Sequence, residues 1–109
     1  MTETVDGASV LAANLTERDL QRHVRKFAED MGWRVAVTWS SIHSPKGWPD
    51  LTCCRAGKLV FIELKTEKGK ITPEQREWLN DLNDVPGVIF SNVVRPSDWY
   101  AGMLDEVLR

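Results

Sequence analysis

The chain has 109 residues, of which 42% are hydrophobic and 28% are charged, and its formal net charge is −2. This length and composition are typical of one globular domain with its own core. No apolar run approaches the roughly 20 residues that cross a bilayer. Nucleic-acid binders often carry a basic excess, so this balance argues mildly against avid DNA binding without a bridging cation.

The N-terminal segment lacks the basic start and apolar run of a signal peptide. We therefore expect residues 1–14 to be a flexible lead-in and residues 15–109 to form one domain. The two cysteines, Cys53 and Cys54, are adjacent and lack the spacing of a disulfide framework or of a structural zinc site. These features predict a cytoplasmic protein that needs neither a membrane nor an organic cofactor.

The first helix is predicted from about residue 16 to residue 31. Thr16 is a suitable N-cap and Gly32 is a suitable stop. Glu17 lies one turn before the apolar stripe of this helix, so its side chain should point toward the sheet. The stripe recurs at helical spacing and consists of Leu20, Val24, Phe27, Ala28 and Met31.

A strand is expected over residues 33–39, followed by a polar loop over residues 40–47 and then a β-hairpin. Residues 56 and 57, Ala-Gly, suit a two-residue turn that would make Arg55 face Lys58. Counting back along both strands then puts Asp50 opposite Glu63. Opposed residues share one face of a sheet, and Lys65, two residues further on, shares that face as well.

The next helix is strongly indicated at residue 72. Thr72 is its N-cap, Pro73 occupies the first helical position, and Gln75 completes a capping box. A strand over residues 88–94 and a last helix capped by Ser97 follow. The resulting order, α-β-β-β-α-β-α, predicts an α/β fold in which helices pack on one mixed sheet.

The charged face of the hairpin has the chemistry of a metal site. Asp50 and Glu63 supply hard oxygen ligands of the kind that Mg²⁺ or Mn²⁺ prefers, and two adjacent acids repel each other unless a cation lies between them. The backbone carbonyl of Leu64 and the carboxylate of Glu17 are further candidate ligands. Lys65 could orient a water molecule or stabilise charge that develops on a phosphate.

These residues resemble the motif of the PD-(D/E)XK nuclease superfamily: Pro49-Asp50, a gap of twelve residues, then Glu63-Leu64-Lys65. The flanking segments narrow the resemblance. Residues 47–51 (GWPDL), 61–65 (FIELK) and 72–79 (TPEQREWL) together are similar to a VRR-NUC domain, the virus-type replication-repair nuclease family. The resemblance covers about residues 16–99.

The resemblance implies a restriction-endonuclease-like α-β-β-β-α-β core and Mg²⁺- or Mn²⁺-dependent cleavage of phosphodiesters, with residues 15–109 as a single nuclease domain. It implies that Asp50 and Glu63 bind metal and that Lys65 is the catalytic lysine. Glu17 matches the acid that the family has in its first helix, and Gln75 matches the glutamine after the motif. Small stand-alone members are phage or bacterial proteins similar to Holliday junction resolvases, which act as homodimers.

Several of these residues also have a purely structural alternative. Glu17 could be a first-turn acid that complements the helix dipole, and nearby Asp19 could be the family's acid instead, although helical phase favours Glu17. Gln75 could serve only as the capping partner of Thr72. His43 is expected to be a loop residue rather than a ligand. Trp48 could wedge against a base of the DNA, but it is rather expected to close the core, and the other tryptophans are expected to pack on apolar faces.

Basic residues supply the candidate DNA contacts. Lys46, Lys68 and Lys70 lie on loops that flank the predicted site, although the last two could equally be solubilising turn residues. Along the first helix, like charges four residues apart are locally unfavourable, which indicates either an anionic partner such as the DNA backbone or a solvated face. This basic stripe consists of Arg18, Arg22, Arg25 and Lys26.

The function predicted from the sequence is a divalent-metal-dependent endonuclease that hydrolyses DNA phosphodiester bonds. Branched DNA is the expected substrate, cleaved by a homodimer, and a phage-encoded protein would work in the cytoplasm of its bacterial host. One alternative is a nuclease without junction preference that acts on flaps, single strands or duplex. The other is a catalytically silent DNA-binding module of the same fold, against which the intact set of two acids and a lysine argues.

Overall fold

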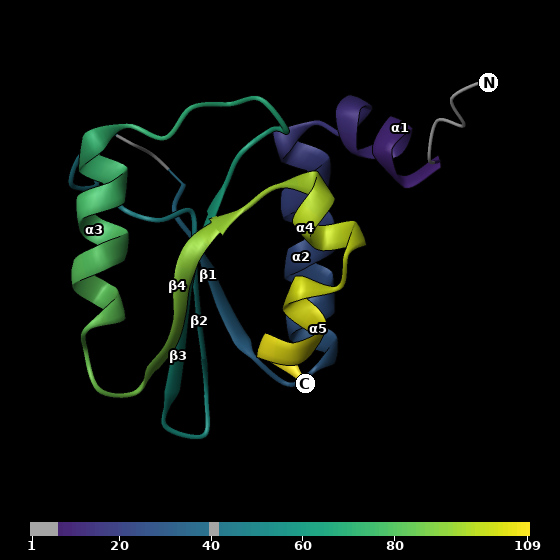
Figure 1. Cartoon of the computed structure of the whole chain (residues 1–109). Coiled ribbons are helices and arrows are strands. Elements are labelled where there is room, and N and C mark those ends of the chain that lie inside the picture. The colour runs from purple at the N-terminus through teal and green to yellow at the C-terminus, as the bar shows by residue number, and fades with distance from the viewer. Residues whose placement is uncertain (1–6, 40–41) are drawn as a thin grey trace.

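The structure is a computed structural model that describes residues 7–39 and 42–109. Helices lie on both faces of one sheet (Figure 1). The expected alternation of helices and strands is present, with an added N-terminal helix and a divided C-terminal one. The elements are α1 (Gly7–Asn14), α2 (Glu17–Asp30), β1 (Arg34–Val37), β2 (Leu51–Arg55), β3 (Lys58–Leu64), α3 (Pro73–Asn83), β4 (Val88–Val94), α4 (Pro96–Tyr100) and α5 (Met103–Leu108).

The sheet is mixed, as predicted, with the strand order β1-β2-β3-β4. The first two pairings are antiparallel and β3 pairs with β4 in parallel. At the tip of the hairpin, Ala56 and Gly57 have φ values of 50° and 78°, as a type I′ turn requires. Arg55 therefore faces Lys58, which confirms the predicted register.

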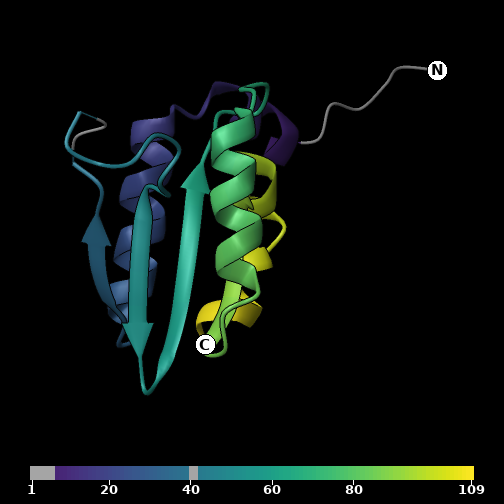
Figure 2. The same ribbon diagram turned by 90° about the vertical axis from the view of Figure 1, so that its left-hand side faces the viewer.

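The two faces of the sheet are covered differently. Helices α2, α4 and α5 lie on one face and α3 lies on the other (Figures 1 and 2). The predicted stripe of α2 is confirmed, since Leu20, Val24 and Ala28 are fully buried in the main core against β2 and β3. On the opposite face α3 inserts Leu79, which is also fully buried. Because α3 connects two parallel neighbours, it must cross the sheet from end to end.

Both ends of the chain differ from the prediction. Residues 7–14, expected to belong to a flexible lead-in, form helix α1 instead, while residues 1–6 lie outside the described part. The segment is rich in good helix formers, and α1 packs against α4 with Ala12 only 3% exposed. Tertiary packing thus orders a segment that shows no amphipathic pattern of its own.

The predicted last helix is two short helices, and Ser97 is not its N-cap. Arg95 occupies that position, its backbone N–H donating to Asp98 Oδ2 at 2.8 Å, while Pro96 takes the first helical position. Gly102, with a φ of 81°, then interrupts the helical path before α5 begins. The first strand is also shorter than the predicted residues 33–39.

The tryptophans were expected to pack, and one does not. Trp33 is 3% exposed and donates its indole N–H to the carbonyl of Leu108 at 2.8 Å. Trp48, Trp78 and Trp99 all contact other aromatic rings. Trp39, just beyond β1, is 94% exposed. The prediction is therefore wrong for Trp39, because β1 ends at Val37 and no neighbouring element covers the position.

Within the residues that the structure describes, no helix is long and apolar enough to cross a membrane.

Candidate active site

Asp50 lies one residue before β2, where the chain enters the hairpin. The ladder between β2 and β3 ends at Leu51 opposite Ile62. The next pair in this register is Asp50 opposite Glu63, as the sequence predicts. Its carboxylate is held by the backbone, since the N–H of Leu64 donates to Asp50 Oδ2 at 2.8 Å. The Asp50 carbonyl accepts the N–H of Thr38 at 2.8 Å, which ties the site to the end of β1.

Glu63 is the most deeply buried acid of the site, with its side chain 3% exposed. Its Oε1 atom accepts a hydrogen bond from Gln75 Nε2 at 3.1 Å and lies 4.0 Å from Lys65 Nζ. Its Oε2 atom is buried and has no hydrogen-bond partner in the described structure. A buried carboxylate oxygen without a partner is costly, so this atom is available for a ligand.

The electrostatics of Glu63 indicate excess negative charge at the site. Burial, followed by the repulsion of Asp50, raises the pKa of Glu63 from 4.5 to about 8. Lys65 opposes this rise and the charge of Glu17 adds to it. One ammonium therefore does not balance the acids around it, and a divalent cation would favour their ionised forms.

Glu17 is the helix acid that interacts electrostatically with Asp50 and Lys65. Partial burial and then the negative charge of Asp50 raise the pKa of Glu17, while Lys65 lowers it. Asp19 instead forms an ion pair with Arg22 at 2.9 Å, and its backbone N–H donates to Thr16. Of the two acids left open by the sequence, Glu17 interacts electrostatically with the hairpin, while Asp19 forms an ion pair within its own helix.

The donor set suits Mg²⁺ or Mn²⁺ with two protein carboxylates. Such ions keep several water ligands and are often bound through one or two carboxylates plus a substrate phosphate. The unpartnered Oε2 of Glu63, next to Asp50, meets that requirement. Over residues 7–39 and 42–109, however, no three His, Cys, Asp or Glu side chains gather as a metal site. Glu17, at the start of α2, has an exposed side chain, and its role as a further ligand stays a prediction.

Gln75 caps α3 and also contacts Glu63. Its Oε1 accepts the N–H of Thr72 at 2.9 Å, and its own N–H donates to Thr72 Oγ1 at 3.2 Å, which forms the predicted capping box. Its Nε2 is thereby free to donate to Glu63. The cap thus orients the amide that holds one oxygen of the buried carboxylate.

Gly47 is a site residue that the sequence reasoning did not single out. It has a φ of 88°, and a Cβ atom there would lie 2.5 Å from the backbone carbon of Glu74 and 2.7 Å from the Gln75 nitrogen. Only glycine lets the loop before Asp50 approach the first turn of α3 so closely. Its place in the Gly-Trp-Pro-Asp segment was the available signal.

Trp48 closes this contact, as predicted. Its ring meets the rings of Phe61 and Trp78 edge-on, at centroid distances of 5.7 and 5.0 Å. The indole N–H of Trp78 donates to the carbonyl of Lys46 at 3.1 Å. The aromatic cluster therefore fastens the Asp50 loop, β3 and α3 together, so that Glu63 and Gln75 meet.

The loop after β3 is held by Arg95, a contact that the sequence did not reveal. Arg95 Nη1 donates to the carbonyls of Thr66, Glu67 and Gly69 at 2.8, 3.3 and 2.7 Å. A Cβ at Gly69 would lie 3.6 Å from the Lys65 side chain, so this loop folds back over the site lysine. It carries Lys68 and Lys70, both of which are exposed.

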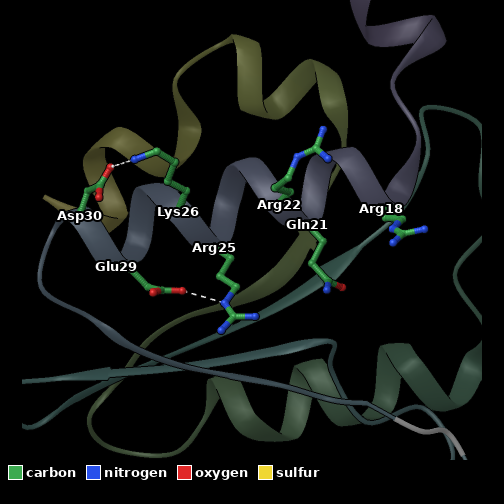
Figure 3. A pocket seen from close by; sticks show the side chains of 7 residues that line it. All are labelled: Arg18, Gln21, Arg22, Arg25, Lys26, Glu29 and Asp30. Atoms are coloured by element: carbon green, nitrogen blue, oxygen red, sulfur yellow. Dashed lines mark hydrogen bonds and ion pairs between the residues drawn. The ribbon is translucent and has the colours of Figure 1, made fainter.

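The basic stripe of α2 is largely neutralised by its own helix. Figure 3 shows Arg25 directed at Glu29 and Lys26 at Asp30, at 2.7 and 2.9 Å, and Arg22 is paired with Asp19 as described above. These residues line an open concavity of about 560 Å³ that does not include the acid pair. The structure thus supports a mostly solvated face. Arg18 lies at the end of the concavity nearest the start of α2.

The other predicted residues lie as follows. Lys46 is 80% exposed and lies 3.3 Å from Glu74 Oε1. His43 is an exposed loop residue, as expected.

A mixed sheet with an acid pair at one end of its central hairpin, one acid of the pair buried and a lysine adjoining it, is typical of the PD-(D/E)XK nucleases. The family model of the VRR-NUC domain matches residues 10–94 of this chain. Since that match covers most of its length, the chain belongs to the VRR-NUC family. The match begins within α1 and ends with β4, so α4 and α5 lie beyond it. No solved structure matches the chain.

Proposed function

We propose that this VRR-NUC protein is an Mg²⁺- or Mn²⁺-dependent endonuclease that hydrolyses phosphodiester bonds in DNA. The observation that carries the proposal is the buried, unpartnered Oε2 of Glu63 beside Asp50. A folded protein retains such a costly arrangement where a ligand completes it. Membership of the family supports the nuclease class.

In this proposal Asp50 and Glu63, with the carbonyl of Leu64, hold the cation. The cation would polarise a phosphate oxygen and lower the pKa of water near it. The residues around the pair keep it in position. The Leu64 N–H fixes one oxygen of Asp50, while Gln75 fixes one oxygen of Glu63. This arrangement leaves Oε2 of Glu63 for ligation.

Lys65 has a separate role in the proposal. Its side chain is only 17% exposed and stays next to Glu63, so a positive charge is held beside the acids at little further entropic cost. That ammonium would stabilise charge on the attacked phosphate and orient the attacking water. Glu17 contributes negative charge near the same atoms and could accept a proton from water.

We propose branched DNA as the substrate and a homodimer as the active form. Both rest on the resemblance to small junction resolvases, because cutting two strands of a four-way junction requires two sites. Lys46, Lys68 and Lys70 lie on loops flanking the acid pair and are the proposed phosphate contacts. Arg18 and Arg22 would contribute from α2, Arg22 only after leaving Asp19.

The test is a cleavage assay on a four-way junction, a flap, a duplex and a single strand, with Mg²⁺, Mn²⁺ or EDTA. Asp50→Asn and Lys65→Met should each lower cleavage at least about a hundredfold. The matched controls Asp81→Asn and Lys58→Ala change exposed residues outside the site and should cleave normally.

Cleavage that persists in EDTA, or unchanged cleavage by Asp50→Asn, would refute the mechanism. Paired symmetric cuts in the junction alone would support resolution, and equal cutting of all four substrates would favour a general nuclease. A solution mass of one chain at working concentration would count against the dimer.

A further inference from the structure

Trp39 is the most exposed large apolar side chain in the described part of the chain. It is 94% exposed, compared with 87% for Ile42 and 3% for Trp33. An indole that stays in water gains none of the free energy that burial of an aromatic ring provides. Trp39 therefore contributes little to the stability of the fold. A ring in this state is suited to a flat partner that covers it.

The position of Trp39 relates it to the candidate active site. The preceding residue, Thr38, donates its hydroxyl to the carbonyl of Pro49 at 2.6 Å and its N–H to that of Asp50 at 2.8 Å. Consecutive Cα atoms are about 3.8 Å apart, so the backbone of Trp39 lies close to that of Asp50. It also follows β1 (Arg34–Val37), which is an edge strand of the sheet.

The charges around this end of the sheet suit a phosphate backbone. Lys46, at the end of the loop that starts with Trp39, is 80% exposed. Lys68 and Lys70 lie on the loop that folds back over Lys65. An aromatic platform combined with lysines is how proteins hold a single strand, because the ring stacks on a base while the cations follow the phosphates.

We propose that Trp39 stacks on an unpaired nucleobase of the DNA next to the phosphate that is cleaved. The bases of an intact duplex already stack on one another, so only a single strand, a flap or the centre of a branch offers a free face. This inference rests on the proposed nuclease function and deepens it. It makes unpaired bases at the cleavage site a requirement for tight binding.

The test compares Trp39→Ala and Trp39→Phe with the unmodified chain and with the control Ile89→Ala. Ile89 is 47% exposed, but it lies in β4 toward the end of the sheet remote from Glu63. Binding of a short oligothymidylate is followed by indole fluorescence in EDTA, and KM is measured with Mg²⁺ on a flap and on a blunt duplex.

We expect oligothymidylate to quench the fluorescence of the unmodified chain, and most of this quenching to vanish in Trp39→Ala. By the usual worth of one stacked base, Trp39→Ala should weaken oligothymidylate binding and raise KM for the flap roughly 5- to 150-fold. Trp39→Phe should recover part of the loss. The duplex KM should change less than twofold in all variants, and Ile89→Ala should match the unmodified chain.

Equal flap KM values for Trp39→Ala and the unmodified chain, in an enzyme that cleaves, would overturn the role of Trp39 and leave the nuclease proposal intact. Binding of oligothymidylate by Trp39 without any cleavage would refute the nuclease proposal alone. If EDTA abolishes binding by the unmodified chain, the KM ratio decides instead, and absence of both binding and cleavage overturns both proposals. If Trp39→Ala converts a dimer to a monomer without changing DNA affinity per site, the ring belongs to a protein contact and the inference is wrong.

Discussion

The protonation of Glu63 should make the metal-free protein less stable as pH rises. Its pKa is raised in the folded state by burial and by Asp50, from 4.5 to about 8. The folded chain therefore binds this proton more tightly than the unfolded chain does. Stability due to the protonated carboxyl is fully present below pH 4.5 and is lost progressively as pH rises toward about 8.

The size of the effect follows from the shift. A rise from 4.5 to about 8 corresponds to at most about 5 kcal/mol, at about 1.4 kcal/mol per pKa unit. Water and side-chain rearrangement around the ionised acid reduce this figure. We therefore expect the free energy of unfolding to fall by about 1–3 kcal/mol more in the unmodified chain than in Glu63→Gln.

The assay is urea unfolding in EDTA near pH 5 and near pH 9, for the unmodified chain, Glu63→Gln and the control Glu77→Gln. Glu77 is an exposed glutamate on α3. Titrating groups that do not interact with Glu63 contribute equally to all three chains and cancel when the pH-dependent changes are compared. The control should show the full fall and Glu63→Gln a smaller one. An identical fall in all three would show that Glu63 is not held in a protonated state, and the argument for an overcharged site would fail.

Two further predictions concern the contact between the Asp50 loop and α3. In urea unfolding, Gly47→Ala should lower the free energy of unfolding by about 1–3 kcal/mol more than Gly57→Ala does. Both glycines have a positive φ, but only the new Cβ at residue 47 would meet backbone, at 2.5 Å. Equal losses of stability would contradict the close approach. Gln75→Glu can keep the capping box but places a second acid against Glu63. Its melting temperature in EDTA should therefore be lower than that of Gln75→Ala. If Gln75 were only a cap, the order of the two melting temperatures would be reversed.

Local rules predicted much of this protein. The Thr72 cap, the turn at Gly57 and the stripe of α2 depend on neighbours within a few residues, and all are found where the sequence puts them. The register of the hairpin in turn brought Asp50 beside Glu63, because side chains in paired strands alternate with a strict period of two.

The remaining features depend on contacts between distant segments. The bond from Gln75 to Glu63 exists because Gly47 admits α3, and the Arg95 guanidinium holds a loop 26 to 29 residues earlier in the chain. The same dependence explains the errors at Trp39 and α1. Periodicity shows which face of an element is apolar, but not whether another element arrives to cover it. The sequence by itself thus determined the elements and the acid pair, while tertiary packing decided which residues surround that pair and which aromatic ring stays in solvent.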